Sequence, residues 1–162
     1  MINDLQPQWI MGSPPCTAFC IWNYGYNYKH MKKSDVDAKL EEGRRHLSFC
    51  AYLYRKQLAK GRYFLHEHPA NASSWKEPCI VQLIADLDLH LTTSPMCAYG
   101  MIIRDSEGDP LGLARKNTTW LSNGEAIVRK LEATCSGWIC SMDVPVKLKF
   151  ILLHSVVPLW PA

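Results

Sequence analysis

Apolar positions in the first third of the chain fall into one short run and one long periodic pattern. The run within residues 5–12 predicts a buried strand, which ends where Gly12 and two prolines follow. The next residues, 16–33, are rich in Tyr, Asn and Lys and are expected to form a loop. A long helix is then predicted from Ser34, capped at its end by Gly61, because apolar residues recur at helical spacing at positions 36, 40, 47, 50, 51, 54 and 58.

The pattern continues with strands and shorter helices. Residues 62–68 predict a strand that Pro69 ends. Ser74 and Glu77 have the spacing of a capping box, which predicts that a helix begins there. Asn123 is expected to cap a last helix, which reaches about residue 135. Between these two helices, three further strands are predicted at residues 87–93, 96–103 and 117–121.

This order of strands and helices predicts an α/β fold with parallel central strands. The chain has 162 residues, of which 48% are hydrophobic and 20% charged, and this is the composition of one globular domain. No apolar run is long enough to span a bilayer, and no basic leader precedes an apolar segment. We therefore expect no membrane association, an intracellular location and mostly reduced thiols among the seven cysteines.

The segment after the first predicted strand carries the candidate chemistry. Ligands of open α/β sheets bind beyond the carboxyl ends of the strands, so Cys16 stands where a nucleophile is expected. Glu67 would lie at the same edge if the two strands are neighbours. Two plainer interpretations remain open: a rigid Pro-Pro turn with a buried thiol, and an acid that caps the next helix. No metal site is predicted, since Cys-x-x-Cys is absent and His66 and His68 form only a pair.

The segment Gly12-Ser-Pro-Pro-Cys-Thr-Ala-Phe19 resembles the catalytic loop of DNA cytosine-5 methyltransferases. In that family a helix follows, and then a strand that ends in Glu-Asn-Val, where this chain has Phe64-Leu-His-Glu-His68. The family's later Tyr-Gly and basic segment resembles Ala98-Tyr-Gly100 and Arg115-Lys-Asn-Thr118. The chain is also similar to methyltransferase-like segments of some eukaryotic mobile-element polyproteins.

The resemblance implies a Rossmann-like fold with an antiparallel hairpin at one edge of the sheet. It implies that Cys16 attacks carbon 6 of a flipped cytosine, that Glu67 holds the Watson–Crick edge and that Arg115 steadies the exocyclic oxygen. S-adenosylmethionine would supply the methyl group, with Pro14 and Pro15 beside it. Nucleic acid would be the partner, in the nucleus if it is DNA. The net charge of +3 is compatible with such a partner.

The chain also departs from the family. Thr17 and Cys20 replace the usual Gln and Ser, and His66 and His68 flank Glu67. No Gly-x-Gly pattern occurs, so the loop that would bind the methyl donor is missing. We therefore expect a truncated domain over residues 1–136, inactive without its N-terminal half, and an off-pattern tail over residues 137–162.

Two rival functions are considered beside this expectation. One is a non-catalytic remnant of a mobile-element polyprotein that binds nucleic acid or protein, which the missing donor loop favours. The other is an amino-group methyltransferase, whose loops are also rich in proline. A cysteine directly after Pro-Pro disfavours the second rival, because those enzymes usually have an aromatic residue there.

Overall fold

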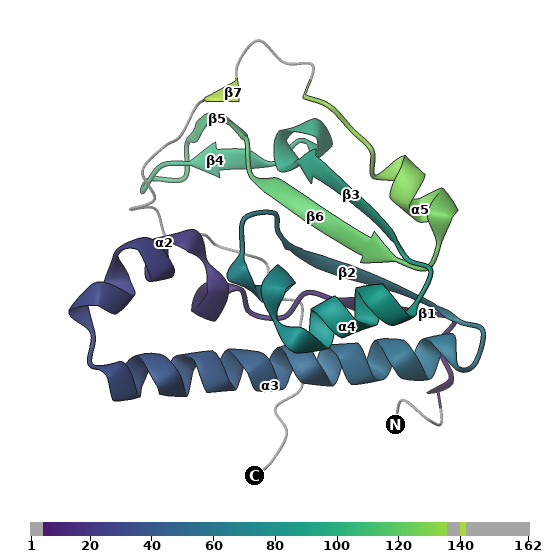
Figure 1. The fold of residues 1–162 in the computed structure, drawn as a ribbon. Helices are drawn as coiled ribbons and strands as arrows, with labels where there is room; N and C mark the ends of the chain where they lie inside the picture. The colour runs from purple at the N-terminus through teal and green to yellow at the C-terminus, as the bar shows by residue number, and fades with distance from the viewer. Residues whose placement is uncertain (1–4, 136–139, 142–162) are drawn as a thin grey trace.

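The computed structural model describes residues 5–135 and 140–141, and its centre is a four-stranded mixed sheet in the order β1-β2-β6-β3 (Figure 1). β1 (Trp9–Gly12) pairs in parallel with β2 (Tyr63–Pro69). β6 (Asn117–Ser122) is antiparallel to both of its neighbours, β2 and β3 (His90–Pro95). Thus β1, β2 and β3 run in one direction and β6 runs against them. The prediction of an α/β fold is confirmed at the level of a mixed sheet, but the prediction of parallel central strands is wrong, because the central strands β2 and β6 are antiparallel and the parallel pair β1–β2 lies at one edge.

Antiparallel pairing also occurs outside this sheet. β4 (Ile102–Arg104) and β5 (Pro110–Ala114) form an antiparallel hairpin, and β7 (Cys140–Ser141) pairs in parallel with β5. The resemblance implied an antiparallel hairpin at one edge of the main sheet, but the hairpin β4–β5 belongs to a separate sheet. The antiparallel strand of the main sheet, β6, is an inner strand between β2 and β3. Apart from β7, the tail expected over residues 137–162 lies outside the described residues.

The long helix α3 (Lys33–Leu58) connects β1 to β2 and agrees with the helical spacing of the sequence. It ends in a Schellman motif, in which the Arg62 N–H donates to the Gln57 carbonyl and the Gly61 N–H donates to the Leu58 carbonyl. Gly61 has a φ of 64°, the left-handed conformation that glycine adopts most easily. The predicted cap is confirmed.

The segment predicted as a loop over residues 16–33 is instead largely helical. It contains η1 (Thr17–Phe19), α2 (Ile21–Gly25) and η2 (Asn27–His30). The Phe19 side chain is 1% exposed and packs into the core, which fixes the start of the segment. The sequence pattern missed these turns because they are too short to show a period.

Two predicted helix caps are wrong, because both side chains bind groups at or beside β2 instead of the first turn of a helix. Ser74 lies inside η3 (Ser73–Lys76) and hydrogen-bonds His68, while α4 (Pro78–Asp86) begins after Glu77. Asn123 does not cap α5 (Glu125–Lys130). Its amide accepts the Phe64 N–H and donates to the Arg62 carbonyl, and so ties β6 to the start of β2.

The strand predicted over residues 96–103 is also partly wrong. Residues Met96–Tyr99 form the 3-10 turn η4, and only Ile102–Arg104 is extended. Gly100 adopts a φ of 77°, which ends the turn and reverses the chain direction.

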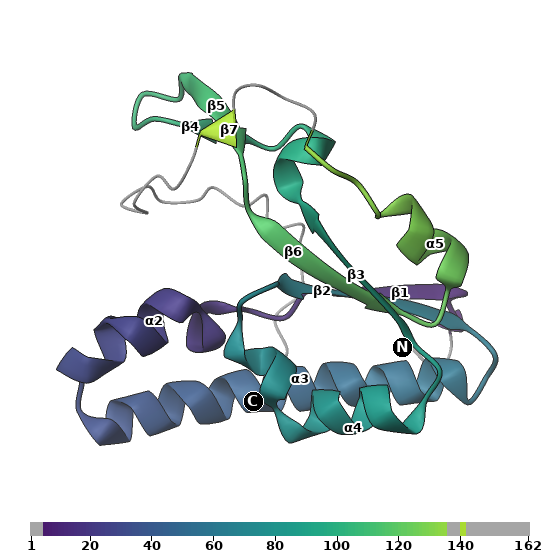
Figure 2. The same cartoon turned by 45° about the horizontal axis from the view of Figure 1, so that its top comes forward.

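The core lies between the sheet and the helices α3 and α4. Figure 2 shows these two helices beneath β1 and β2, and α5 on the other side of the sheet. The buried side chains form two clusters, one near η1 and one under the middle of the sheet: Phe19, Leu47, Ala72 and Ile80, and Tyr54, Phe64, Leu83 and Leu121. Among the described residues no helix is long and apolar enough to cross a membrane.

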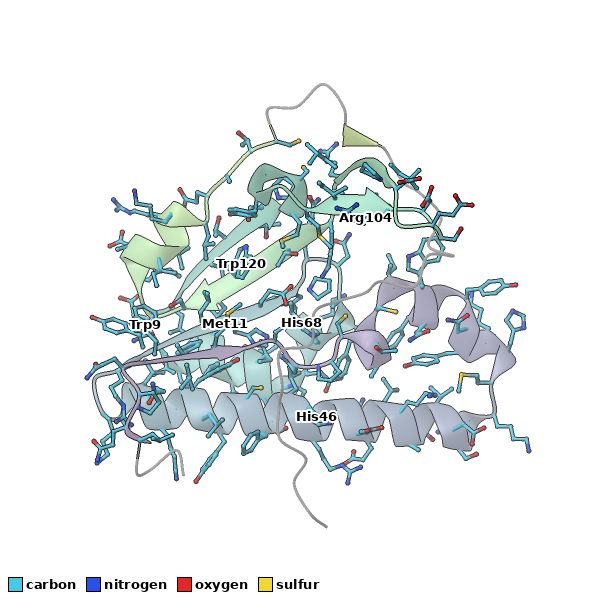
Figure 3. The ribbon with its side chains drawn as sticks, turned by 180° about the vertical axis from the view of Figure 1, so that it is seen from behind. Trp9, Met11, His46, His68, Arg104 and Trp120 are labelled. Atoms are coloured by element: carbon cyan, nitrogen blue, oxygen red, sulfur yellow. The ribbon has the colours of Figure 1, made fainter. Side chains whose placement is uncertain are left out.

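β1 is an edge strand of the main sheet, because within the described chain it pairs with β2 alone. Trp9 and Met11 on this strand are 42% and 63% exposed (Figure 3). The last residue of β1, Gly12, meets the Tyr54 hydroxyl from α3, and a Cβ at position 12 would lie 1.8 Å from that oxygen. This close approach fixes how β1 lies on α3.

Replacing Gly12 with alanine is therefore expected to destabilise the fold. Overpacking at a rigid site costs about 1–3 kcal/mol, so the free energy of unfolding of Gly12→Ala should fall by that amount in chemical denaturation. Gly25→Ala is the matched control, since a Cβ there meets nothing within 4 Å. Tyr54→Phe should cost less stability in the Gly12→Ala background than in the wild type, because it removes the oxygen that the new Cβ would meet. Equal stability of Gly12→Ala and Gly25→Ala would contradict the packing described here.

Candidate active site at the carboxyl edge of β1 and β2

The parallel register of β1 and β2 places the candidate nucleophile and the candidate acid at one edge of the sheet. Gly12 is opposite His66, so the loop with Cys16 leaves β1 beside the end of β2. The expectation that the two strands are adjacent and parallel is confirmed. The Ser13 hydroxyl donates a 2.5 Å hydrogen bond to Oε2 of Glu67 and links the loop directly to the acid. Sequence reasoning did not single out Ser13.

A basic group from a third strand reaches the same place. The Lys116 Nζ lies 3.8 Å from Oε1 of Glu67, because β6 runs antiparallel to β2 and begins beside its end. Arg115, the basic residue expected here, is exposed, and no ion pair of it occurs within the described chain. The neighbouring position, Lys116, supplies the charge instead. The similarity of the two basic residues in sequence left no signal to choose between them.

The Cys16 thiol is only partly accessible, and its pKa is raised above its ordinary value. Burial is the main cause, and the nearby Cys20 and Glu67 also raise the pKa, while Lys116 lowers it. Burial outweighs the lysine, so the thiol is protonated at neutral pH in the free chain. Cys16 nevertheless interacts electrostatically with Cys20, Glu67 and Lys116. A thiol, a carboxyl group and an amine therefore share one site.

Two buried histidines of β2 lie beneath this site, both 1% exposed. His68 Nε2–H donates to the Pro14 carbonyl at 3.2 Å, while its Nδ1 accepts the Ser74 hydroxyl. His66 Nδ1 hydrogen-bonds the Tyr54 hydroxyl at 2.8 Å. His68 therefore holds the backbone of the Pro-Pro-Cys loop from below, with Ser74 fixing the ring.

Burial keeps both histidines neutral. It lowers the pKa of His66 to about 3, with a smaller effect from the neighbouring His68. It also lowers the pKa of His68, although Glu67 and the bond to Pro14 oppose the shift. The two rings stack with their centroids 5.7 Å apart. The Nδ1 atom of His66 is bonded to the Tyr54 hydroxyl, and the Nδ1 atom of His68 is bonded to the Ser74 hydroxyl. Across residues 5–135 no group of three or more His, Cys, Asp or Glu residues is arranged to hold a metal ion.

The arrangement can deliver a thiol to an electrophilic carbon while a carboxyl group and an amine contact polar atoms of the same molecule. Comparisons with models of protein families, with curated proteins and with solved structures found no match for this chain.

The charges around Cys16 predict how two substitutions change its reactivity. Glu67→Gln removes a group that raises the thiol pKa and should speed alkylation by iodoacetamide at neutral pH. Lys116→Gln removes a group that lowers the pKa and should slow it. The pH dependence of alkylation, followed by peptide mass spectrometry in a Cys20→Ser background, measures both shifts. Shifts of the opposite sign would show that these groups do not face Cys16.

The buried histidines predict a loss of stability in acid. An unfolded histidine titrates near pH 6.5, whereas His66 in the fold titrates near 3, so below about pH 6.5 the unfolded chain binds the proton first. The free energy of unfolding should therefore fall with decreasing pH across this window, by up to about 1.4 kcal/mol per pH unit for one histidine.

His66→Phe should flatten the slope of this dependence, and the exposed His46 provides the control, because His46→Gln should leave the slope unchanged. Urea denaturation at a series of pH values gives the slopes directly. A slope that is the same in wild type and His66→Phe would contradict a neutral, buried His66.

Proposed function

We propose that this chain is a truncated Rossmann-like methyltransferase domain that acts on cytosine in nucleic acid through Cys16. The observation that carries the proposal is the shared edge of β1 and β2, where the Cys16 loop is hydrogen-bonded through Ser13 to Glu67. The spacing that resembles the cytosine-5 family thus coincides with residues that meet in space.

The chemistry follows from the groups present. The Cys16 thiolate adds to carbon 6 of the pyrimidine, and the electrons of the C5–C6 double bond move toward carbon 5 and the ring carbonyl. The Glu67 carboxyl contacts the Watson–Crick edge, where it accepts a hydrogen bond from the exocyclic amine or gives a proton to N3. Carbon 5 becomes nucleophilic and can take an electrophile, after which loss of its proton and of the thiolate restores the aromatic ring.

The basic group of this site is Lys116 as well as the expected Arg115. Lys116 already faces Glu67 in the free chain, where its charge also lowers the Cys16 pKa. Arg115 is the residue that the family resemblance implies for the exocyclic oxygen, and its exposed side chain is free to reach a substrate. Both basic residues would favour a polyanionic substrate.

The described residues do not fit the methyl donor. Pro14 is buried with its carbonyl bound to His68, and Tyr54 occupies the space next to Gly12. The turn after β1 leads into η1, a single 3-10 turn of three residues, so no long helix presents its N–H groups there. S-adenosylmethionine would need a donor loop from outside the described residues, and the open edge of β1 is where a further strand could pair.

A non-catalytic binding module is the second candidate. The raised pKa of Cys16 and the absence of a donor cradle among the described residues both favour it. In that case the chain would be a remnant that binds nucleic acid or another protein, and the thiol would be a buried structural group. A location in the nucleus belongs only to the version of the proposal in which the substrate is DNA.

Covalent trapping separates the two candidates without a methyl donor. An oligonucleotide with 2-pyrimidinone in place of cytosine is electron-poor at carbon 6 and should form a thioether with Cys16, detected as a mass increase of the intact chain at mildly alkaline pH. Cys16→Ser should abolish the adduct, because a serine hydroxyl remains protonated. Glu67→Gln should slow formation of the adduct about 10²–10⁴-fold, the usual contribution of a positioned acid to a reaction rate.

Cys20→Ser is the matched control and should still form the adduct, because Cys20 is a nearby free thiol outside the proposed role. An adduct that survives Cys16→Ser would place the nucleophile elsewhere. Absence of any adduct in a folded chain that binds the oligonucleotide would favour the binding module.

A further inference from the structure

The segment that follows Cys16 carries basic side chains and no acidic ones. Residues 13–34 contain neither Asp nor Glu, whereas Lys29, His30, Lys32 and Lys33 are all exposed. Lys33 pairs with Asp37, but Lys29 and Lys32 have no ion pair within residues 5–135. This face therefore complements a negatively charged partner.

Exposed aromatic rings lie on the same segment. Trp22, Tyr26 and His30 follow one another at intervals of four residues, and all three are exposed. Trp22 is 59% and Tyr26 is 66% exposed, and the Tyr26 and His30 rings lie 5.0 Å apart. Large rings on short helical turns normally pack into a core, as Phe19 does. We call Trp22, Tyr26 and His30 the aromatic row.

A cavity of about 770 Å³ opens between this segment and the first half of α3. Tyr26 and His30 of the aromatic row line it together with polar groups that can donate or accept hydrogen bonds, among them Asn27, Lys39 and His46. Figure 3 shows His46 on α3. Glu42 is the one acid among the described residues that line the cavity, and it can accept an exocyclic N–H. The volume is sufficient for a nucleobase with its sugar.

The segment that carries the aromatic row is held to the loop of the nucleophile by two neighbouring side chains. The Asn23 amide donates to the Thr17 carbonyl, and the Tyr28 hydroxyl donates to the Ala18 carbonyl at 2.8 Å. Pro15 and Thr17, on either side of Cys16, also line the cavity. A strand bound along the row would therefore lie next to Cys16.

We propose that residues 20–33 form a platform for single-stranded nucleic acid, with bases stacked on the aromatic row and one base in the cavity. Bases offer their faces to aromatic rings only when they are unpaired, while lysines beside the rings follow the phosphates. A duplex keeps its faces stacked inside and could use only the lysines. The inference rests on the proposed function for its choice of nucleic acid as partner, and it adds that the strand is unpaired.

Fluorescence anisotropy of the full chain with a labelled oligonucleotide of about ten nucleotides tests the platform, since that length is within the usual site size. The single strand should bind more tightly than the duplex of the same sequence. Trp22→Ala and Tyr26→Ala should each weaken binding to the single strand about tenfold. Lys29→Gln with Lys32→Gln should reduce the slope of log affinity against log salt by about 1.4, or 0.7 for each phosphate contact.

Phe49→Ala and Tyr52→Ala are matched controls, because both rings are more than half exposed on α3, outside residues 20–33. They should leave the affinity unchanged. Equal loss in the controls, equal affinity for the duplex, or full affinity in Trp22→Ala with Tyr26→Ala would each overturn the platform.

The outcomes for the platform and for catalysis can be told apart, because this binding assay needs neither Cys16 chemistry nor a donor. Tight, aromatic-dependent binding without any 2-pyrimidinone adduct would support the platform and overturn only the catalytic proposal. An adduct formed at full rate by Trp22→Ala with Tyr26→Ala would overturn the platform and leave the catalytic proposal standing.

Discussion

The parallel pairing of β1 with β2 is the constraint on which the rest of the structure depends. Two neighbouring parallel strands cannot be joined by a tight turn and need a long crossover, which the 26-residue helix α3 supplies. The crossover returns the chain so that both strands end at one edge of the sheet. Cys16 and Glu67, far apart in sequence, meet there as a consequence of topology.

The packing beneath this edge is unusually polar for a core. β2 presents His66 and His68 inward, and burial of an unpaired polar group would cost several kcal/mol, on the order of 2–7. Tyr54, Ser74 and the Pro14 carbonyl provide the partners that avoid this cost. Those bonds also connect α3, η3 and the Cys16 loop, so stability of the core and position of the loop depend on the same two rings.

A third buried polar side chain has the same role at the other end of the two strands. Gln57 of α3 is 2% exposed, and its amide donates to the Pro7 and Tyr63 carbonyls while its oxygen accepts from Arg62. It therefore holds the beginnings of β1 and β2 against the end of the helix. By contrast, the buried Thr118 hydroxyl has no partner within the described residues, and nothing in the structure explains it.

Features that depend on the spacing within one helix could be predicted from the sequence, and features that depend on contacts with another element could not. The helix α3 and its cap at Gly61 follow from periodicity and from the freedom of glycine. Ser74 and Asn123 match capping patterns equally well, yet His68 and the backbone of β2 recruit them. At the site, the order of the strands was enough to predict the Cys16 loop and the acid Glu67. The roles of Ser13 and Lys116 could not be predicted, because they depend on the register in which β1, β2 and β6 pair.

In the free chain the candidate nucleophile Cys16 is a protonated thiol, and the groups that set its pKa show how a substrate could change this. Burial raises the Cys16 pKa more than Lys116 lowers it, and Glu67 adds to the rise while also neutralising the lysine. A base that engages Glu67 by its Watson–Crick edge would take that carboxylate away from Lys116. The charge of Lys116 would then be less fully neutralised by Glu67, and the pKa of the Cys16 thiol would fall toward its ordinary value, although burial and Cys20 would still raise it. Substrate binding and formation of the Cys16 thiolate would thus be coupled through the Glu67–Lys116 ion pair.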